Sequence, residues 1–144
     1  MSTDRRQARI LAMQAICHWD AQRDATPGTV GDFLEEQEAA EPTRRFALEL
    51  VEQFLSRQNE IDEALGQAAT NWSLERMTLV ERNLLRTAAT ELMMGATPSK
   101  VVMNEAIEIG REFGGAETPA FVNGILDSVA RSMAGRHGAK NGVV

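Results

Sequence analysis

Apolar side chains recur along most of this chain at the three- and four-residue spacing of amphipathic helices. Between about residues 4 and 23 they form one stripe, made of Ala8, Leu11, Ala12, Ala15, Ile16 and Trp19. From about residue 43 a second stripe follows, made of Ala47, Leu50, Val51, Phe54 and Leu55. No segment shows a convincing alternation of apolar and polar β-branched residues. The pattern therefore predicts an all-α fold.

Turn and capping residues divide this pattern into about seven helices. Thr78 and Glu81 have the T-x-x-E spacing of a capping box, and Gly95 is placed to end the helix that follows with a left-handed cap. We predict a compact bundle of about seven helices joined by short loops. It forms a single domain over residues 1–135, where the last helix ends, and a disordered basic tail follows over residues 136–144.

The charge of the chain is negative overall and uneven along its length. A formal net charge of −6 argues against non-specific adhesion to nucleic acid, because the total charge sets the long-range field. Residues 1–9 nevertheless hold three arginines and one aspartate, whereas residues 32–63 are rich in acids. An acidic body with a local basic face fits specific RNA binding, or binding to a partner that brings more positive charge. With one cysteine and no apolar run of membrane-spanning length, we expect a cytoplasmic protein without disulfides.

The sequence carries no motif of a metal centre, a nucleotide-binding fold or a nucleophilic enzyme. His18 and His137 stand far apart, and HExxH, P-loop, GxSxG and dinucleotide fingerprints are absent. Glu105 and Glu108 lie on nearby turns, but no histidine accompanies them at the spacing of a di-metal bundle. Cys17 has no histidine at i+3 or i+4 to activate it. We therefore expect no enzymatic activity, no metal and no cofactor.

Two groups of residues point to RNA instead. Arg5, Arg6 and Arg9 stand at the start of the first helix, where they offer positive charge to phosphates. Phe121 lies about 100° from Val122 on the last helix, at the margin of the apolar stripe, where a ring can pack with one side and offer the other to a base. The alternatives are a solvated helix face for the arginines and core packing for Phe121. We expect alanine at position 6 or 9 to weaken RNA binding and to change folding little.

Several segments of the chain together carry a family pattern. The last two predicted helices contain KVVMNEAIEI at residues 100–109 and FVNGILD at residues 121–127, and the chain opens with RRQARILAMQAI at residues 5–16. These segments resemble the KVxINEAIELAK, FVNGVLD and RRxARxxAxQAL motifs of the NusB family of bacterial transcription antitermination factors. Residues 80–92 are similar to the family's central helix. The resemblance covers nearly the whole chain in order, and its C-terminal motif is the most specific.

The resemblance implies an all-helical fold of two packed subbundles. It also implies binding of the boxA element of ribosomal RNA leaders jointly with the ribosomal protein NusE, after which the heterodimer joins the elongating RNA polymerase with other Nus factors. The RNA-binding residues are then expected to be Arg5, Arg6, Arg9, Arg86, Glu117 and Phe121. The partner surface is expected to include Glu81 and His18, the latter at a position where the family often has tyrosine.

Two of these residues have a second interpretation. Arg86 lies off the main stripe of its helix and is either a phosphate contact or a surface ion pair, of which we favour the ion pair. Glu81 is explained by its capping box with Thr78. A further role of Glu81 in partner binding requires that its side chain remain partly exposed.

Two other classes of protein stay open on the sequence alone. A similar domain forms the RNA-binding head of ribosomal RNA 5-methylcytosine methyltransferases, which also need a Rossmann-like domain with a catalytic cysteine, so this alternative requires the chain to be a fragment. The second alternative is a purely protein-binding bundle, such as a weak homodimer that masks its basic helix. RNA binding with and without the partner, at two salt concentrations, separates these classes.

Overall fold

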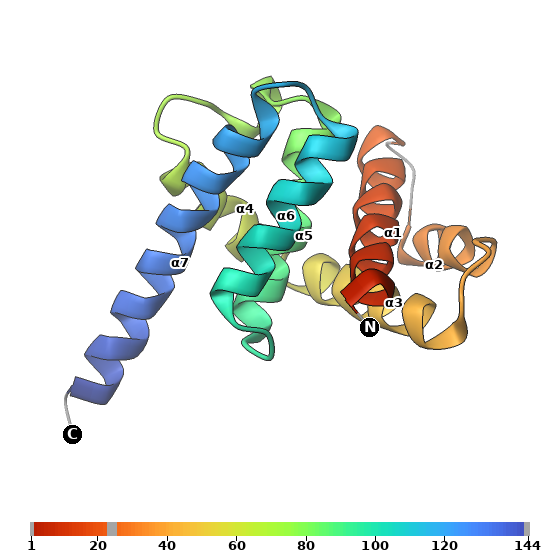
Figure 1. The fold of residues 1–144 in the computed structure, drawn as a ribbon, viewed down its shortest axis with the longest axis horizontal. Helices are drawn as coiled ribbons and strands as arrows, with labels where there is room; N and C mark the ends of the chain where they lie inside the picture. The colour runs from red at the N-terminus through yellow and green to blue at the C-terminus, as the bar shows by residue number, and fades with distance from the viewer. Residues whose placement is uncertain (1, 23–25, 143–144) are drawn as a thin grey trace.

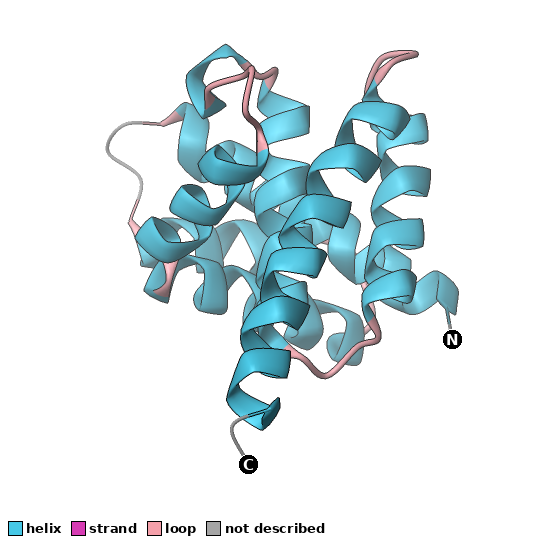
Figure 2. Cartoon of the chain, turned by 90° about the vertical axis from the view of Figure 1, so that its left-hand side faces the viewer, coloured by secondary structure: helices cyan, strands magenta, loops and turns pink. Residues whose placement is uncertain are grey.

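Helices make up the described part of the structure, a computed structural model that covers residues 2–22 and 26–142 (Figure 1, Figure 2). In chain order they are α1 (Ser2–Ala21), α2 (Pro27–Glu35), α3 (Glu41–Ser56), α4 (Gln58–Ala68), the 3-10 turn η1 (Leu74–Arg76), α5 (Leu79–Met94), α6 (Ser99–Phe113) and α7 (Thr118–Gly142). These residues contain no strand, and the all-α prediction is confirmed. Within the same residues, no helix is both long and apolar enough to cross a membrane.

The helices form two subbundles that share one apolar core. α1, α2 and α3 pack on one another at one side, while α4 and α6 pack against α5 and α7 at the other (Figure 1). α1 and α3 also contact α5, so α5 lies between the two groups. Core residues of both groups form a single buried cluster. The prediction of two packed subbundles is confirmed.

The position of α5 explains the unusual burial of its side chains. The sequence predicts one buried stripe on this helix, whereas residues 83–92 are buried without interruption. A helix that is buried all round lies inside a core, and its polar groups then need partners. Two threonine hydroxyls find them in their own helix: Thr87 Oγ1 donates to the carbonyl of Asn83, and Thr90 Oγ1 donates to that of Arg86, both at 2.7 Å.

Both ends of α5 have the caps that the sequence predicts. Thr78 Oγ1 accepts the backbone N–H of Glu81 at 3.1 Å, and Glu81 Oε1 accepts that of Thr78 at 3.2 Å. This reciprocal pair confirms the capping box. Gly95 ends the helix with a φ of 75°, a left-handed conformation that glycine adopts without steric cost, so this prediction is also confirmed.

The end of the last helix differs from the prediction. α7 continues to Gly142, so its expected end at Gly135 is wrong, and the backbone of residues 136–142 is helical where we expected disorder. A glycine inside a helix costs only about 1 kcal/mol relative to alanine, which helix-forming neighbours offset. The side chains of this basic tail lie outside the described residues.

Candidate nucleic-acid and partner interface

The three arginines at the start of α1 lie in three different environments. Arg5 is exposed, and its guanidinium carbon lies 3.9 Å from the centre of the Phe46 ring on α3. A cation over a ring face is attracted by the ring quadrupole. Because this contact uses one face of the guanidinium, the N–H groups at its edge stay available to a phosphate. Arg5 is therefore exposed at the start of α1, where the sequence predicts positive charge that is accessible to phosphates.

Arg6 is half-exposed and bound to a carboxylate. Its side chain is 41% exposed, with Nε donating to Glu105 Oε1 at 3.0 Å and Nη2 donating to Oε2 at 2.7 Å. This bidentate pair joins α1 to α6 and fixes the direction of the guanidinium. Arg6 keeps one exposed side, but Glu105 neutralises part of its charge.

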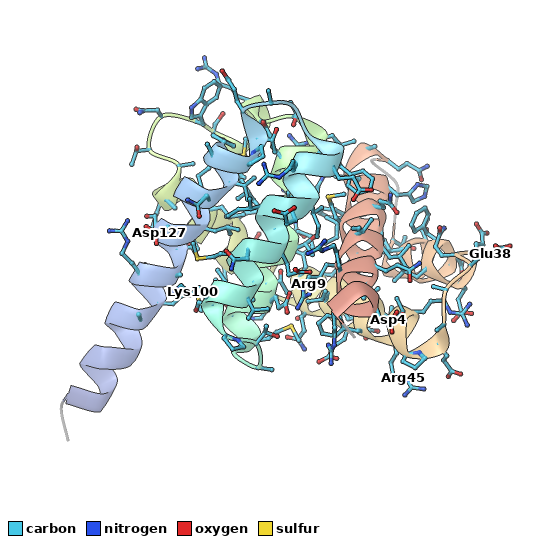
Figure 3. All side chains as sticks on the ribbon, in the orientation of Figure 1. Asp4, Arg9, Glu38, Arg45, Lys100 and Asp127 are labelled. Atoms are coloured by element: carbon cyan, nitrogen blue, oxygen red, sulfur yellow. The ribbon has the colours of Figure 1, made fainter. Side chains whose placement is uncertain are left out.

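Arg9 is buried, in contrast to the exposed RNA contact that we expected and to the solvated helix face that was its alternative. Its side chain is 8% exposed and lies between α1 and α6, as Figure 3 shows. Nε and Nη2 donate to the two oxygens of Glu91 at 2.7 and 2.8 Å, and Nη1 lies 3.4 Å from Glu105 Oε1. The Glu91 side chain is only 2% exposed. Arg9 joins the subbundles, and because a buried charge is costly without its partner, the structure leads us to expect that its loss destabilises the fold, contrary to the prediction from the sequence.

Arg86 is buried too, and it is not the surface ion pair that we favoured. Nε and Nη2 donate to the two oxygens of Asp62 on α4, each at 2.9 Å. Nη1 donates to Asp20 on α1 at 3.2 Å and to Asn83 Oδ1 at 2.9 Å. Its side chain is 8% exposed, with no free edge for a phosphate. Arg86 is buried because α5 lies in the centre of the protein. The side of α5 that carries Arg86, outside its predicted apolar stripe, packs against α1 and α4.

The carboxylate of Glu105 has a lowered pKa, chiefly because it accepts hydrogen bonds from Arg6. The stability it contributes is therefore fully present above the ordinary glutamate pKa of about 4.3 and is lost as the pH falls through the lowered value. Acid titration of the free energy of unfolding should show a shallower loss in Glu105→Gln than in the parent protein. Glu108→Gln, an exposed neighbour, is the control and should follow the parent curve. Superimposable curves for Glu105→Gln and the parent would contradict this coupling.

The residues expected to bind a partner gather at the opposite end of the bundle, where α1 ends and α5 and α7 begin (Figure 1). Glu81 is partly buried, and its second oxygen, Oε2, accepts the Thr118 hydroxyl at 3.2 Å. Glu81 thus caps α5 and ties the start of α7 to it. His18, near the end of α1, stacks on Phe33 of α2 with ring centres 5.2 Å apart. Both side chains keep part of their surface exposed, which the partner role of Glu81 requires.

The start of α7 carries the aromatic and acidic residues expected to contact RNA. Glu117 is exposed just before the helix, and its carbonyl accepts the backbone N–H of Phe121 at 3.1 Å. Phe121 is partly buried and contacts Trp72 edge to face, with ring centres 6.0 Å apart at 83°. Phe121 therefore lies at the margin of the core, as the stripe predicts. Trp72, which the sequence shows only as part of a turn, also lies at this end of the bundle.

The candidate residues do not form one patch. Figure 1 places the start of α1 at the lower end of the bundle and the start of α7 at the upper end, and the sequence of α1 puts Arg5 and Arg6 in its first turns. Arg86 lies inside the protein, and Glu81 lies beside the start of α7 through Thr118. The structure thus offers two exposed regions, one basic and one aromatic, along a layer formed by α1, α6 and α7.

The fold and these two regions define a class of protein: an all-α bundle of two subbundles, joined by buried ion pairs, with a basic helix start at one end and exposed aromatic rings at the other. The model of the NusB family matches residues 6–131 of this chain. The chain belongs to the NusB family.

Individual relatives are similar over almost their whole length. The transcription antitermination protein NusB of Trichlorobacter lovleyi is 44% identical over 126 residues, which cover 87% of this chain and 89% of the relative. The NusB of Anaeromyxobacter dehalogenans is 37% identical over 137 residues, covering 92% and 94%. Both carry the name of an antitermination protein and neither that of an enzyme. The methyltransferase alternative gains no support from them.

Solved structures share the fold. NusB of T. maritima has a TM-score of 0.80 at 30% identity and is covered over 90% of its length by 88% of this chain. The crystal structure of the antitermination factors NusB and NusE in complex with dsRNA contains a chain with a TM-score of 0.81 at 25% identity, covered over 99% of its length by 92% of this chain.

Proposed function

We propose that this chain is an RNA-binding transcription antitermination factor of the cytoplasm. It binds the boxA element of ribosomal RNA leaders together with the ribosomal protein NusE, and the heterodimer joins the elongating RNA polymerase with other Nus factors. Residues 1–135 act as a single RNA-binding domain. The observation that carries the proposal is the basic surface at the start of α1, where Arg5 is exposed and Arg6 is half-exposed on a protein that is acidic overall.

The two exposed regions suit different parts of this task. Arg5 and Arg6 offer guanidinium N–H groups to phosphates, which supply affinity but carry little sequence information. Phe121 offers part of its ring to a base and Glu117 offers a free carboxylate, so this region can contribute to base recognition. Arg9 and Arg86 hold the helices that present these groups and are not part of the proposed RNA surface. Because the net charge is −6, a basic partner should strengthen binding by adding phosphate contacts.

Arg6→Ala should weaken RNA binding and reduce its salt dependence. Each phosphate contact that is lost lowers the slope of log affinity against log salt by about 1. Binding of a labelled boxA-type RNA across a salt series measures this slope. Arg57→Ala, which removes a partly exposed arginine directly after α3, is the control and should leave the slope unchanged. If the folded Arg6→Ala variant showed the same slope of log affinity against log salt as the parent protein, Arg6 would serve only its ion pair with Glu105.

Glu81→Lys should impair NusE binding more than it impairs RNA binding by the isolated chain. The variant loses the carboxylate that accepts the Thr78 N–H, which is half of the capping box on α5, at a cost of about 0.5–2 kcal/mol of folding stability, and also the acceptor for Thr118. Glu81→Gln is the matched variant, since its amide oxygen still accepts one hydrogen bond without the charge. Titration calorimetry with NusE, read beside the melting temperature, separates the two roles. Normal NusE binding in a strongly destabilised Glu81→Lys protein would leave Glu81 as a cap alone.

A further inference from the structure

Trp72 is the most exposed large apolar side chain of the described residues. Its side chain is 52% exposed in the segment between α4 and η1, beside the start of α7. Its backbone N–H donates to the carbonyl of Ala69 at 3.2 Å, so the residue is held on an ordered turn. Its indole N–H has no protein hydrogen-bond partner within the described part of the chain. Tryptophan is enriched at binding interfaces, so this ring is a candidate contact for a ligand.

The contact between Trp72 and Phe121 leaves ring surface for a third planar group. The two rings stand nearly perpendicular, at 83°, with centres 6.0 Å apart, so one ring meets the other through its edge. Two perpendicular rings form a step in which a flat group can stack on one ring and touch the other. Phe121 is partly buried, while Trp72 supplies the larger exposed surface.

Two polar residues that are close to these rings in the sequence match a nucleotide. Glu117, four residues before Phe121, is exposed and its carboxylate has no partner among the described residues. A free carboxylate can accept the exocyclic amino group of a base. Arg76, four residues after Trp72 in η1, is exposed and forms no ion pair in that part of the structure. The rings thus supply stacking surface and Glu117 a base-edge acceptor, while Arg76 is the cation nearest to Trp72 in the sequence.

We propose that Trp72 is a second base-stacking residue, which together with Phe121 holds a nucleobase of single-stranded RNA at the start of α7. Stacking is tolerant of sequence because every base has a π-face, whereas Glu117 adds a preference for bases that carry an amino group. This inference rests on the proposed function, since it requires that the protein bind RNA. It adds Trp72, which the family motifs did not indicate, to the residues that contact the RNA. It also accounts for the exposure of an indole that core packing alone leaves uncovered.

Fluorescence tests the inference directly, because the chain has two tryptophans. In Trp19→Phe, Trp72 is the only emitter, and a single-stranded boxA-type RNA should quench it with the same midpoint as the polarisation change of that RNA when labelled. In Trp72→Phe, Trp19 reports instead. Trp19 is partly buried and packs edge to face on Phe54 between α1 and α3, so its emission should stay constant through the same titration.

Affinity gives the second measurement. Trp72→Leu keeps apolar cover over Phe121 but removes the stacking face, and should weaken RNA binding about 5- to 150-fold. Trp72→Phe keeps an aromatic face and should lose less. If Trp72→Leu does not fold, the Trp19→Phe titration decides alone. Undiminished affinity in a folded Trp72→Leu variant, or constant Trp72 emission at saturating RNA, overturns the inference.

The outcomes distinguish this inference from the proposed function. A parent protein that binds no boxA-type RNA, alone or with NusE, refutes the proposed function itself. A parent that binds RNA while Trp72 emission stays constant refutes only the stacking role. A change in Trp72 emission on adding NusE alone, with none on adding RNA, marks Trp72 as a protein contact and equally overturns the inference.

Discussion

Arg9→Ala should lower the free energy of unfolding by about 3–5 kcal/mol, the usual effect of removing one partner of a buried ion pair. The Glu91 carboxylate, 2% exposed, is left without its two hydrogen bonds from Arg9 and too deep for water to replace them. The loss falls between α1 and α5, where the two subbundles meet. Urea unfolding followed by circular dichroism measures it.

Two further variants make the Arg9 result specific. Arg45→Ala removes an ion pair with Glu41 in which both side chains are 73% exposed, and should cost less than about 1 kcal/mol. Arg9→Met combined with Glu91→Leu removes both buried charges and should recover most of the lost stability. A stable Arg9→Ala protein with reduced RNA affinity would instead make Arg9 the exposed RNA contact that its sequence position first indicated.

Arg86→Ala should lower the free energy of unfolding by a similar amount, about 3–5 kcal/mol, since it leaves the Asp62 carboxylate without its cation and removes one of the two arginines that contact Asp20. Asp62 loses both of its hydrogen bonds from Arg86, and Asp20 keeps only those from Arg82 and Asn83. The guanidinium also lies 5.4 Å from the centre of the Phe54 ring, a packing contact that alanine does not replace. Thermal unfolding and urea unfolding should both report the loss.

The control for Arg86 is Arg57→Ala, which removes an exposed pair with Glu60 and should change stability by less than about 1 kcal/mol. Arg86→Lys keeps the charge but cannot bridge Asp62 with two parallel hydrogen bonds, so it should recover only part of the stability. RNA affinity, measured under conditions where Arg86→Ala remains folded, should match that of the parent. Reduced RNA affinity with unchanged stability would restore Arg86 to the RNA surface.

The helical architecture could be predicted from the sequence because its signals are local. The apolar spacing of α1, the capping box at Thr78 and the left-handed Gly95 each need only neighbouring residues, and each is present. The end of α7 could not be predicted, since a glycine is a weak stop whose effect depends on its neighbours.

The roles of the buried arginines depend on partners far away in sequence. Arg9 is 82 residues from Glu91, and Arg86 is 24 residues from Asp62. One signal was present: Arg9 stands three and seven residues before Ala12 and Ile16, on the buried face of α1. A charge on an apolar stripe indicates a buried pair, but only the packing of α5 between the subbundles identifies its partner.

The surface residues were predicted in part. Arg5 and Phe121 lie where their positions on the helix face indicated, because exposure follows from the stripe that each flanks. Trp72 was missed because a tryptophan in a turn has no periodicity from which its exposure can be read. Its contact with Phe121 forms only when α7 packs beside the segment that follows α4.

The central claim is that this chain binds boxA-type RNA jointly with NusE. The most direct measurement is a titration of labelled boxA-type RNA with the chain alone, with NusE alone and with both, at low and at physiological salt, beside a scrambled RNA of equal length. The account predicts weak, salt-sensitive binding by the chain alone and tighter, sequence-selective binding by the pair. Equal affinity of the pair for both RNAs, or no gain over either protein alone, would contradict it.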